Sequence, residues 1–267
     1  MEHPEAIIVV PCYNEAARLR PAAFRDFLDS APDVGLLLVD DGSTDATATV
    51  LHDMAASCPQ MDVHVLPRNS GKAEAVRQGM LRAFERGPSF TGYWDADLAA
   101  PLAAIPLLLN LLRARPALDM AMGSRVQLLG SHIRRSAYRH YLGRVLATAA
   151  AAVLRLPVYD TQCGAKVLRV NERTRTVFES RFRSRWLFDV ELLARLLTAQ
   201  ADDTVDPQMR INEMPLAEWT EVPGSKVRLK DGVAALIELY RIQRAYGASR
   251  QRWQMPLAAT ARAVDAP

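Results

Sequence analysis

Apolar runs of strand length alternate with helix-like stretches over the first half of the chain, and this alternation constrains the fold most strongly. The runs cover residues 6–11, 35–41, 62–67, 90–97 and 119–125. The first two are continuous Val, Ile and Leu segments with no apolar–polar alternation, which is typical of strands covered on both faces. The pattern therefore predicts an α/β fold with a doubly wound, mostly parallel sheet.

The pattern changes from about residue 126. We expect one helix over 131–156, a strand over 160–170, a helix over 186–200, a strand over 209–219 and a basic amphipathic helix over 228–253. No linker separates these parts. The chain is therefore expected to form a single domain over residues 1–247, with two halves that meet near residue 125 and a flexible tail over 248–267.

Composition excludes several classes of protein. Three scattered cysteines, an odd number, predict neither a disulfide framework nor a zinc site, and they indicate a reducing compartment. The longest apolar run, residues 145–154, is about half of the roughly 20 residues that a membrane-spanning helix needs. A net charge of +3 does not indicate a nucleic-acid partner. We expect no signal peptide and no transmembrane anchor.

Polar side chains follow the predicted strands at the points where these strands end. They include Asn14, Asp40, Asp41, Arg68, Asn69, Asp95, Asp97, Ser124 and Arg125. Ligands of open α/β sheets bind outside the carboxyl ends of the strands. The sequence therefore predicts a functional site at this edge.

Two aspartates one residue apart, Asp95 and Asp97, stand in the segment YWDADLAAP. If the extended conformation continues, both point the same way and repel each other unless a positive charge lies between them. Mg²⁺ or Mn²⁺ would provide it and leave coordination positions open for substrate phosphates. On these nine residues alone, the simpler interpretation is an Asx-type turn followed by a helix start at Pro101.

Two further segments carry charge at predicted helix starts. LLLVDDGSTDAT ends a buried strand in Asp40 and Asp41, and the second carboxylate needs a partner such as a ribose hydroxyl. RNSGKAEA places Lys72 at a helix start, where backbone N–H groups and the lysine suit a phosphate. The P-loop spacing is absent, and a solvated helix cap explains this segment better when it is taken alone.

The order of the motifs resembles a known family. VVPCYNEAARL, LLVDDGSTDAT, RNSGKAEAVRQGM, YWDADLAAP and MGSRV are similar to the motifs of glycosyltransferase family 2. DTQCGAKVLR, RWLFDVELLARL and INEMPLAEWTEVPGSKVRLKDG are similar to its dolichyl-phosphate β-glucosyltransferase branch, so the resemblance covers residues 6–245. It implies a GT-A nucleotide-diphosphosugar transferase fold with a C-terminal amphipathic helical elaboration. It also implies an inverting enzyme that moves a hexose, glucose from UDP-glucose, to a polyprenyl or dolichyl phosphate.

The resemblance also implies roles on the donor side, in the half up to residue 125. Asp97 would bind Mg²⁺ or Mn²⁺ directly, and Asp95 would assist through the metal or the ribose. The uridine and ribose would be held by Pro11, Tyr13, Glu15, Asp41 and Lys72. Asp40 ranks below Asp41 and is interpreted as structural.

The acceptor side, residues 126–247, needs different chemistry. A phosphate oxygen is already an anion at neutral pH and needs positioning more than deprotonation, and arginine matches phosphate geometry. The candidate phosphate ligands are Arg125, Arg134, Arg135, Arg139 and Gln162. The alternative for the arginines is a solvated basic helix start. Asp160 is expected to order the pocket. The resemblance implies that Asp189 acts as the acceptor-side base, and the alternative is a carboxylate that the helix dipole favours at a helix N-terminus.

The expected acceptor has a lipid tail, so the enzyme should work at the inner face of the membrane as a peripheral, cytoplasmic protein. The basic amphipathic segments over 133–156 and 228–253 suit a membrane surface. The alternatives are an integral membrane partner, apolar faces that cover the sheet, or a homodimer formed through these faces. Other sugars, other acceptors, a non-catalytic phosphate-binding module and a nucleotidyltransferase stay open, although PCYNEAARL lacks the Gly-rich loop of the last class.

Overall fold

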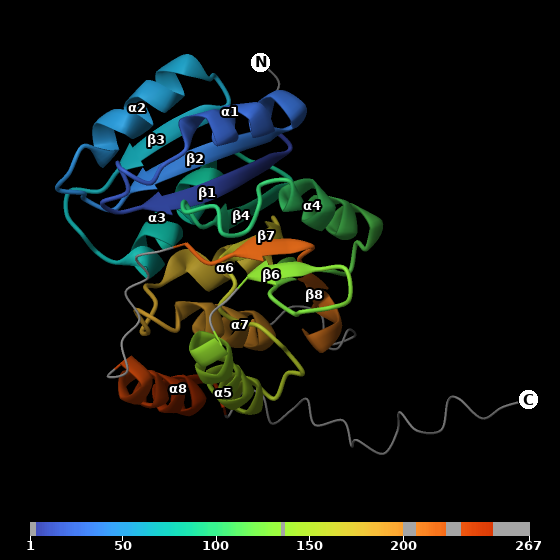
Figure 1. The fold of residues 1–267 in the computed structure, drawn as a ribbon. Helices are drawn as coiled ribbons and strands as arrows, with labels where there is room; N and C mark the ends of the chain where they lie inside the picture. Colours follow the sequence, from blue (N-terminus) through green and yellow to red (C-terminus); the bar gives the residue numbers. More distant parts are fainter. Residues whose placement is uncertain (1–3, 135–136, 200–206, 223–230, 248–267) are drawn as a thin grey trace, which may run out of the picture.

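A seven-stranded sheet forms the centre of the computed structural model, which describes residues 4–134, 137–199, 207–222 and 231–247 (Figure 1). The strand order is β3-β2-β1-β4-β7-β5-β8. The strands are β1 (Ala6–Cys12), β2 (Val34–Asp40), β3 (Met61–Val65), β4 (Phe90–Trp94), β5 (Met120–Ser124), β7 (Ala165–Arg169) and β8 (Ile211–Pro215). Only β7 runs antiparallel to its neighbours, which confirms the predicted mostly parallel sheet.

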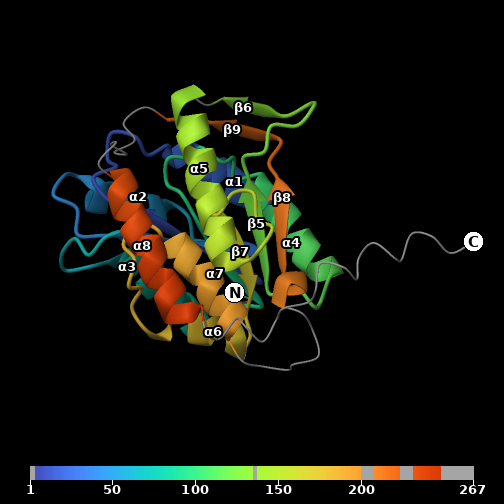
Figure 2. The same cartoon turned by 90° about the horizontal axis from the view of Figure 1, so that it is seen from below.

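Helices cover both faces of this sheet, as the continuous apolar strands require. Ile8 and Val10 of β1 pack in one core with α1 (Pro21–Ser30), α2 (Thr47–Ser57) and α4 (Ala104–Ala114). Ile7 and Val9 point the other way, because strand side chains alternate. Their core contains α3 (Lys72–Glu85), α6 (Glu172–Glu179) and α7 (Phe188–Thr198). α5 (Ala137–Leu154) and α8 (Asp231–Tyr246) lie side by side next to α7 (Figure 2).

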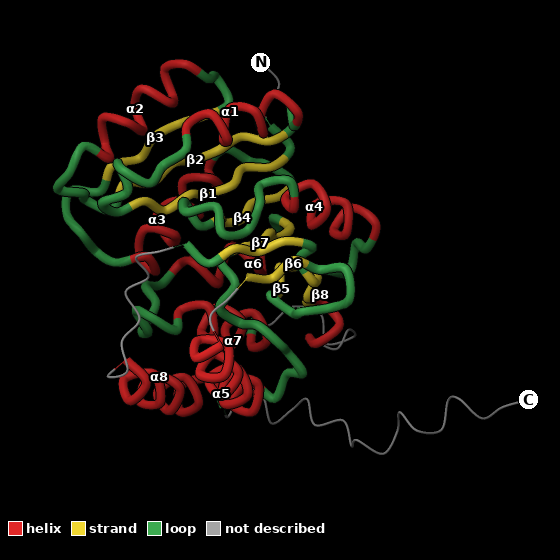
Figure 3. Tube along the Cα trace, viewed as in Figure 1, coloured by secondary structure: helices red, strands yellow, loops and turns green. Residues whose placement is uncertain are grey.

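The sheet brings the polar segments together at one edge. β1, β2, β4 and β5 end there, and the loops that leave β1 and β2 are seen at this edge in Figure 3. Because β7 is antiparallel, its first residue Ala165 pairs with Trp94, the last residue of β4. The DTQCG loop before β7 therefore lies beside the two aspartates that follow β4.

The single helix predicted over 131–156 is wrong at its start. His132–Arg134 form a short strand, β6, which pairs in parallel with β9 (Glu218–Thr220). The amide of His132 donates to the carbonyl of Ala217 at 2.7 Å, and the amide of Glu221 donates to Arg134 at 3.0 Å. This long-range pairing takes the backbone of residues 132–134 out of helical geometry.

Other boundaries also differ. The strand predicted over 209–219 is divided into β8 and β9. Helix α6, which was not predicted, is capped by Asn171, whose side chain accepts from the amide of Thr174 at 2.9 Å. None of the described helices combines the length and apolar character needed to cross a bilayer. The predicted tail, 248–267, lies outside the described residues.

Candidate active site

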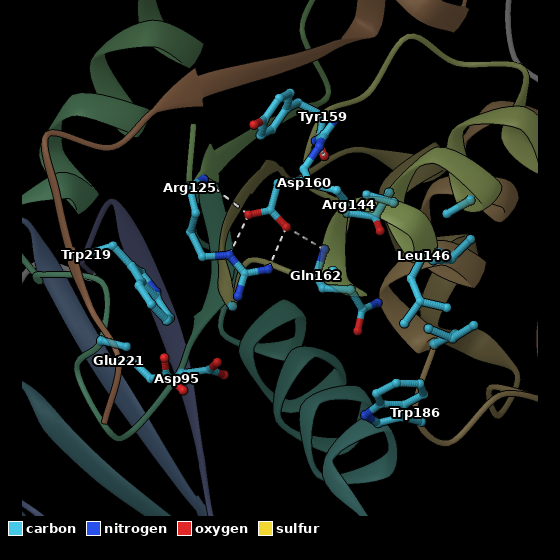
Figure 4. A pocket seen from close by; sticks show the side chains of 18 of the residues that line it. Asp95, Arg125, Arg144, Leu146, Tyr159, Asp160, Gln162, Trp186, Trp219 and Glu221 are labelled. Carbon is cyan, nitrogen blue, oxygen red and sulfur yellow. Dashed lines mark hydrogen bonds and ion pairs between the residues drawn. The ribbon is translucent and has the colours of Figure 1, made fainter. Parts of the chain in front are cut away.

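A cavity of about 350 Å³ lies where the strand ends meet the helices α5, α7 and α8 (Figure 4). One part of its lining is polar and consists of Lys72, Asp95, Asp97, Arg125, Asp160, Thr161 and Gln162. The other part is apolar and consists of Leu146, Ala147, Ala150, Leu187, Val190 and Leu239. A cavity that changes from charged to apolar along its lining suits a ligand with one charged and one apolar end.

The two aspartates after β4 differ in their surroundings. Lys72 forms an ion pair with Asp95, which corrects the expectation that no side chain supplies a counter-charge. Partial burial by itself lowers the pKa of Lys72, but the Asp95 and Asp189 carboxylates raise it above the ordinary value, so the lysine stays charged. Asp97 makes no ion pair with any described residue. Its burial and the Asp95 charge raise the pKa of Asp97, as expected for a carboxylate that lacks a cation.

The backbone around these aspartates is tightly constrained. The amide of Asp95 donates to the carbonyl of Gly164 at 3.0 Å. A Cβ atom at position 164 would overlap the Asp95 carboxylate, so any larger residue there would have to displace that carboxylate. Leu98 has a φ of 53°, in the left-handed region that non-glycine residues rarely adopt. Such strain clusters at functional sites, where the surrounding structure holds it in place.

Arg125 and Asp160 form a bidentate ion pair across the cavity (Figure 4). The Nε–Oδ2 distance is 2.5 Å and the Nη2–Oδ1 distance is 2.7 Å. The Arg125 guanidinium also lies 5.3 Å from the centre of the Trp219 ring. Two predicted site residues are therefore brought together, but the fork of Arg125 is occupied by a carboxylate.

Glu213, on β8, holds this part of the cavity in place. Its Oε2 accepts the amide of Tyr159 at 2.7 Å and its Oε1 accepts the amide of Asp160 at 2.6 Å. This role of Glu213 was not predicted from the sequence. A glutamate within the strand INEMP was the available signal, but its partners lie more than 50 positions away.

Arg144, on α5, lines the cavity beside the apolar wall and was predicted only as part of a basic helix face. Its guanidinium lies 3.6 Å from the centre of the Tyr159 ring, and its Nη1 donates to the Tyr159 carbonyl at 2.9 Å. Nearby, Gln162 Nε2 and Thr161 Oγ1 are buried without a hydrogen-bond partner among the described residues. Orphaned buried polar atoms in a cavity indicate that a ligand completes the site.

Asp189, the predicted base, lies under the cavity and does not line it. It is 3% exposed, its Oδ1 lies 2.6 Å from Lys166 Nζ, and it accepts a hydrogen bond from the Tyr93 hydroxyl. Lys166 also donates to the carbonyls of Thr161 at 3.0 Å and Cys163 at 2.6 Å. Asp189 is thereby linked to the DTQCG loop through a buried lysine.

Cys163 of the same loop is a buried free thiol. Burial raises the pKa of Cys163 to about 12, so the thiol stays protonated at neutral pH. A buried, protonated thiol is a poor nucleophile, so Cys163 is a packing residue.

The residues predicted to hold the nucleotide lie at the ends of β1 and β2, beside the cavity. Asp41 is 2% exposed, and its carboxylate accepts the amides of Ser70 at 2.7 Å and Gly71 at 2.8 Å. Its buried carboxylate thus has a protein partner and fixes the loop before Lys72. Pro11 and Tyr13 are half-buried at the end of β1, and the Glu15 carboxylate pairs with Arg18.

Asp40 has the structural role predicted for it. It accepts the amide of Ser43 at 3.2 Å and is also bonded to the Ser43 hydroxyl.

The remaining arginines are not brought to the cavity by described contacts. Arg134 is exposed on β6 and does not line the cavity. Arg135 and the side chain of Arg139 lie outside the described part of the chain. Among the tryptophans, Trp94 is fully buried, whereas Trp186 and Trp219 line the cavity.

The apolar face predicted for the C-terminal helix α8 is partly buried and partly exposed. Leu239 and Ile242 are buried beside α7 and α5, but Leu236 and Tyr240 are 57% and 64% exposed. Lys230, Arg250, Arg252 and Trp253, the flanking residues of the prediction, lie outside the described residues.

The chain is similar to a known family of proteins. The family model described as glycosyl transferase family 2 matches residues 7–171. A dolichyl-phosphate β-glucosyltransferase of Homo sapiens is 33% identical over an alignment of 243 positions that covers 82% of this chain and 68% of that protein. One from Trichomonas vaginalis is 31% identical, over 88% of this chain and 69% of that protein.

Solved structures of low sequence identity share the fold. Glucosyl-3-phosphoglycerate synthase from Mycobacterium tuberculosis in complex with Mn²⁺ and UDP-glucose has a TM-score of 0.59 and 18% identity. The match covers 95% of this chain and 80% of that one. The predicted GT-A fold is thereby confirmed.

Proposed function

Because this chain belongs to glycosyltransferase family 2, we propose that it transfers glucose from UDP-glucose to a polyprenyl phosphate. The observation that carries the proposal is the cavity that begins at Asp95 and Asp97 and continues along an apolar wall. A sugar nucleotide suits the first part, and a phosphate with an apolar chain suits the second. The named functions of the relatives in Homo sapiens and Trichomonas vaginalis support the same donor sugar and acceptor class.

A divalent metal fits the carboxylates at the donor end. The described residues contain no group of three or more His, Cys, Asp or Glu arranged to hold a metal. Mg²⁺ in proteins is commonly held by one or two carboxylates together with substrate phosphates, and Asp97 with Asp95 provides such a pair. Mn²⁺ or Mg²⁺, when bound, would neutralise charge on the departing diphosphate.

Residues of the chain then account for positioning the donor. Lys72, which stays charged beside Asp95, would face the diphosphate from the first turn of α3. Asp41 would act by fixing the loop that carries Lys72, and Pro11, Tyr13 and Glu15 would form the adjacent uridine and ribose site.

The transfer needs little proton movement. An oxygen of the acceptor phosphate forms the new bond to the anomeric carbon, and the bond from that carbon to the UDP oxygen breaks. The electron pair leaves with UDP, and attack from the opposite side inverts the configuration. Asp189 as a general base remains a prediction, and its burial against Lys166 favours a positioning role for it.

We place the reaction at a membrane surface. The exposed side chains of Leu236, Ile237 and Tyr240 lie on α8, and Arg241 and Arg244 on the same helix are also exposed. Apolar groups bordered by arginines suit a headgroup layer, and each basic side chain adds about 1 kcal/mol near an anionic surface. Cosedimentation with anionic liposomes at low salt should be lost in the variant L236E/Y240E. Equal pelleting of this variant would remove α8 from the interface.

A matrix of donors and acceptors tests the function. The purified protein with Mn²⁺ is given UDP-glucose, UDP-galactose, UDP-N-acetylglucosamine or GDP-mannose, each with and without a polyprenyl phosphate. We expect a glucosylated lipid from UDP-glucose. A product from GDP-mannose alone would assign the protein to the mannosyltransferases of this family, and transfer only to non-lipid acceptors would overturn the acceptor.

A further inference from the structure

The positively charged side chains that line the cavity differ in whether a carboxylate of the protein already pairs with them. Lys72 is paired with Asp95, and Arg125 is paired with both oxygens of Asp160. Arg144 lies within ion-pair distance of no carboxylate among the described residues, and its one hydrogen-bond acceptor is the Tyr159 carbonyl. Arg144 is therefore the lining arginine whose charge a ligand can still use.

The guanidinium of Arg144 is held in place before any ligand binds. It stacks on the Tyr159 ring at 3.6 Å, and the backbone of Tyr159 is fixed in turn by Glu213. Stacking uses the face of the guanidinium and leaves the remaining edge donors free, in a fork that matches phosphate oxygens. Such preorganisation reduces the entropy lost when an anion binds.

Neutral donors and apolar walls flank this arginine. Gln162 Nε2 is a buried donor without a partner, and the Thr161 hydroxyl beside it is also unsatisfied. On the other side, Leu146 follows Arg144 on α5 (Figure 4). Ala147 of α5 and Val190 of α7 also line the cavity. An anion at Arg144 would thus satisfy orphaned donors, and a chain attached to it would lie on apolar side chains.

We infer that Arg144, together with Gln162, binds the acceptor phosphate, and that the apolar wall formed by Leu146, Ala147, Ala150, Leu187, Val190 and Leu239 receives the first part of its hydrocarbon chain. This inference rests on the proposed function and deepens it by assigning the acceptor subsite. It moves the main phosphate contact from Arg125, whose fork is occupied, to Arg144.

Calorimetry with farnesyl phosphate, a short soluble isoprenyl phosphate, tests the subsite without turnover. Binding to the wild-type protein is compared with the variants Arg144→Ala, Arg144→Lys and Gln162→Ala, and with Arg25→Ala as a control on the exposed side of α1. Loss of a charge-assisted contact should weaken binding by about 10- to 100-fold in Arg144→Ala. Arg144→Lys, which keeps the charge but loses the fork, should lie between, and Arg25→Ala should match the wild type.

The other outcomes are equally informative. Unchanged farnesyl phosphate affinity in Arg144→Ala, with a melting curve that shows a folded protein, would overturn the assignment. Inorganic phosphate binding as tightly as farnesyl phosphate would mean a plain anion site and would overturn the role of the apolar wall. In the presence of Mn²⁺, the affinity of every variant for UDP should stay within about twofold of the wild-type value. A twofold change corresponds to well under 1 kcal/mol, as expected if these side chains do not contact the donor. The calorimetry measures binding without glucose transfer. It therefore tests the acceptor subsite even if UDP-glucose proves not to be the donor.

Discussion

Replacing Lys166 with methionine should destabilise the fold and disturb the acceptor side of the site together. Lys166 is 0% exposed on β7, and its ammonium group lies 2.6 Å from Asp189 and hydrogen-bonds two carbonyls of the DTQCG loop. Methionine fills similar space but removes the charge and the donors. Of its partners among the described residues, the Asp189 carboxylate would then keep only the Tyr93 hydroxyl, and the loop would lose its two hydrogen bonds to Lys166.

The burial of both partners determines the size of the effect. Removing one member of a buried ion pair costs about 3–5 kcal/mol, because the other charge stays buried without compensation. For a domain of this size 1 kcal/mol corresponds to about 2–4 °C, so the melting temperature of Lys166→Met should fall by roughly 6–20 °C. Asp189→Asn should cost a comparable amount. The double variant Lys166→Met/Asp189→Leu should cost less than the sum of its single changes, since no charge is left unpaired.

Thermal melts by circular dichroism measure the stability, and initial rates of transfer measure function in the same preparations. If Asp189 positions the loop through Lys166, both single variants should raise the acceptor KM as well as lower the melting temperature. An Asp189→Asn variant that melts like the wild type but has lost turnover would refute this reasoning. It would support the general-base role instead.

Three further results are expected. Asp97→Asn should lower turnover at least about 100-fold, as expected from the loss of one strong transition-state contact. Without metal, the melting temperature of Asp97→Asn should equal or exceed that of the wild type at neutral pH. Burial and the Asp95 charge raise the pKa of Asp97, so the wild-type protein loses stability as the pH rises through this pKa. A lower melting temperature of the variant would contradict this explanation. Gly164→Ala should remove Mn²⁺-dependent UDP binding while its circular dichroism spectrum stays native, because the added methyl displaces the Asp95 carboxylate; unchanged UDP affinity would show that Asp95 can move freely. UDP with Mn²⁺ at 100 times the Kd of UDP should raise the free energy of unfolding by about 2.7 kcal/mol. GDP at the same concentration should raise it by less, and an equal effect of GDP would show that the site does not select uridine.

The strand pattern predicted the architecture and the edge where the site lies. Continuous apolar strands require a parallel sheet, and parallel strands end at one edge, so Asp95, Asp97 and Arg125 were placed together by topology alone. The DTQCG loop joined them through its resemblance to family motifs. These predictions succeed because they depend on local pattern and chain direction.

What the sequence did not predict depends on contacts between distant segments. Strand β6 is three residues long and exists because residues 218–220 pair with it. Arg144 is one of many arginines until α5 is packed beside Tyr159. Asp95 forms an ion pair with Lys72, which lies 23 positions away in the sequence, and only the folded structure shows it. Lys166 was visible as a lysine within an apolar strand, and this signal should have indicated a buried ion pair.

The central claim is that an acceptor phosphate directly displaces UDP at the Asp95–Asp97 site. The most direct test is transfer of labelled glucose from UDP-glucose to a polyprenyl phosphate over a Mn²⁺ titration, with the anomeric configuration of the product assigned by NMR. A β-linked glucosyl phosphate that forms only with metal, and that is lost in Asp97→Asn, is the predicted result. An α-linked product, or an undiminished rate in excess chelator, would contradict the account.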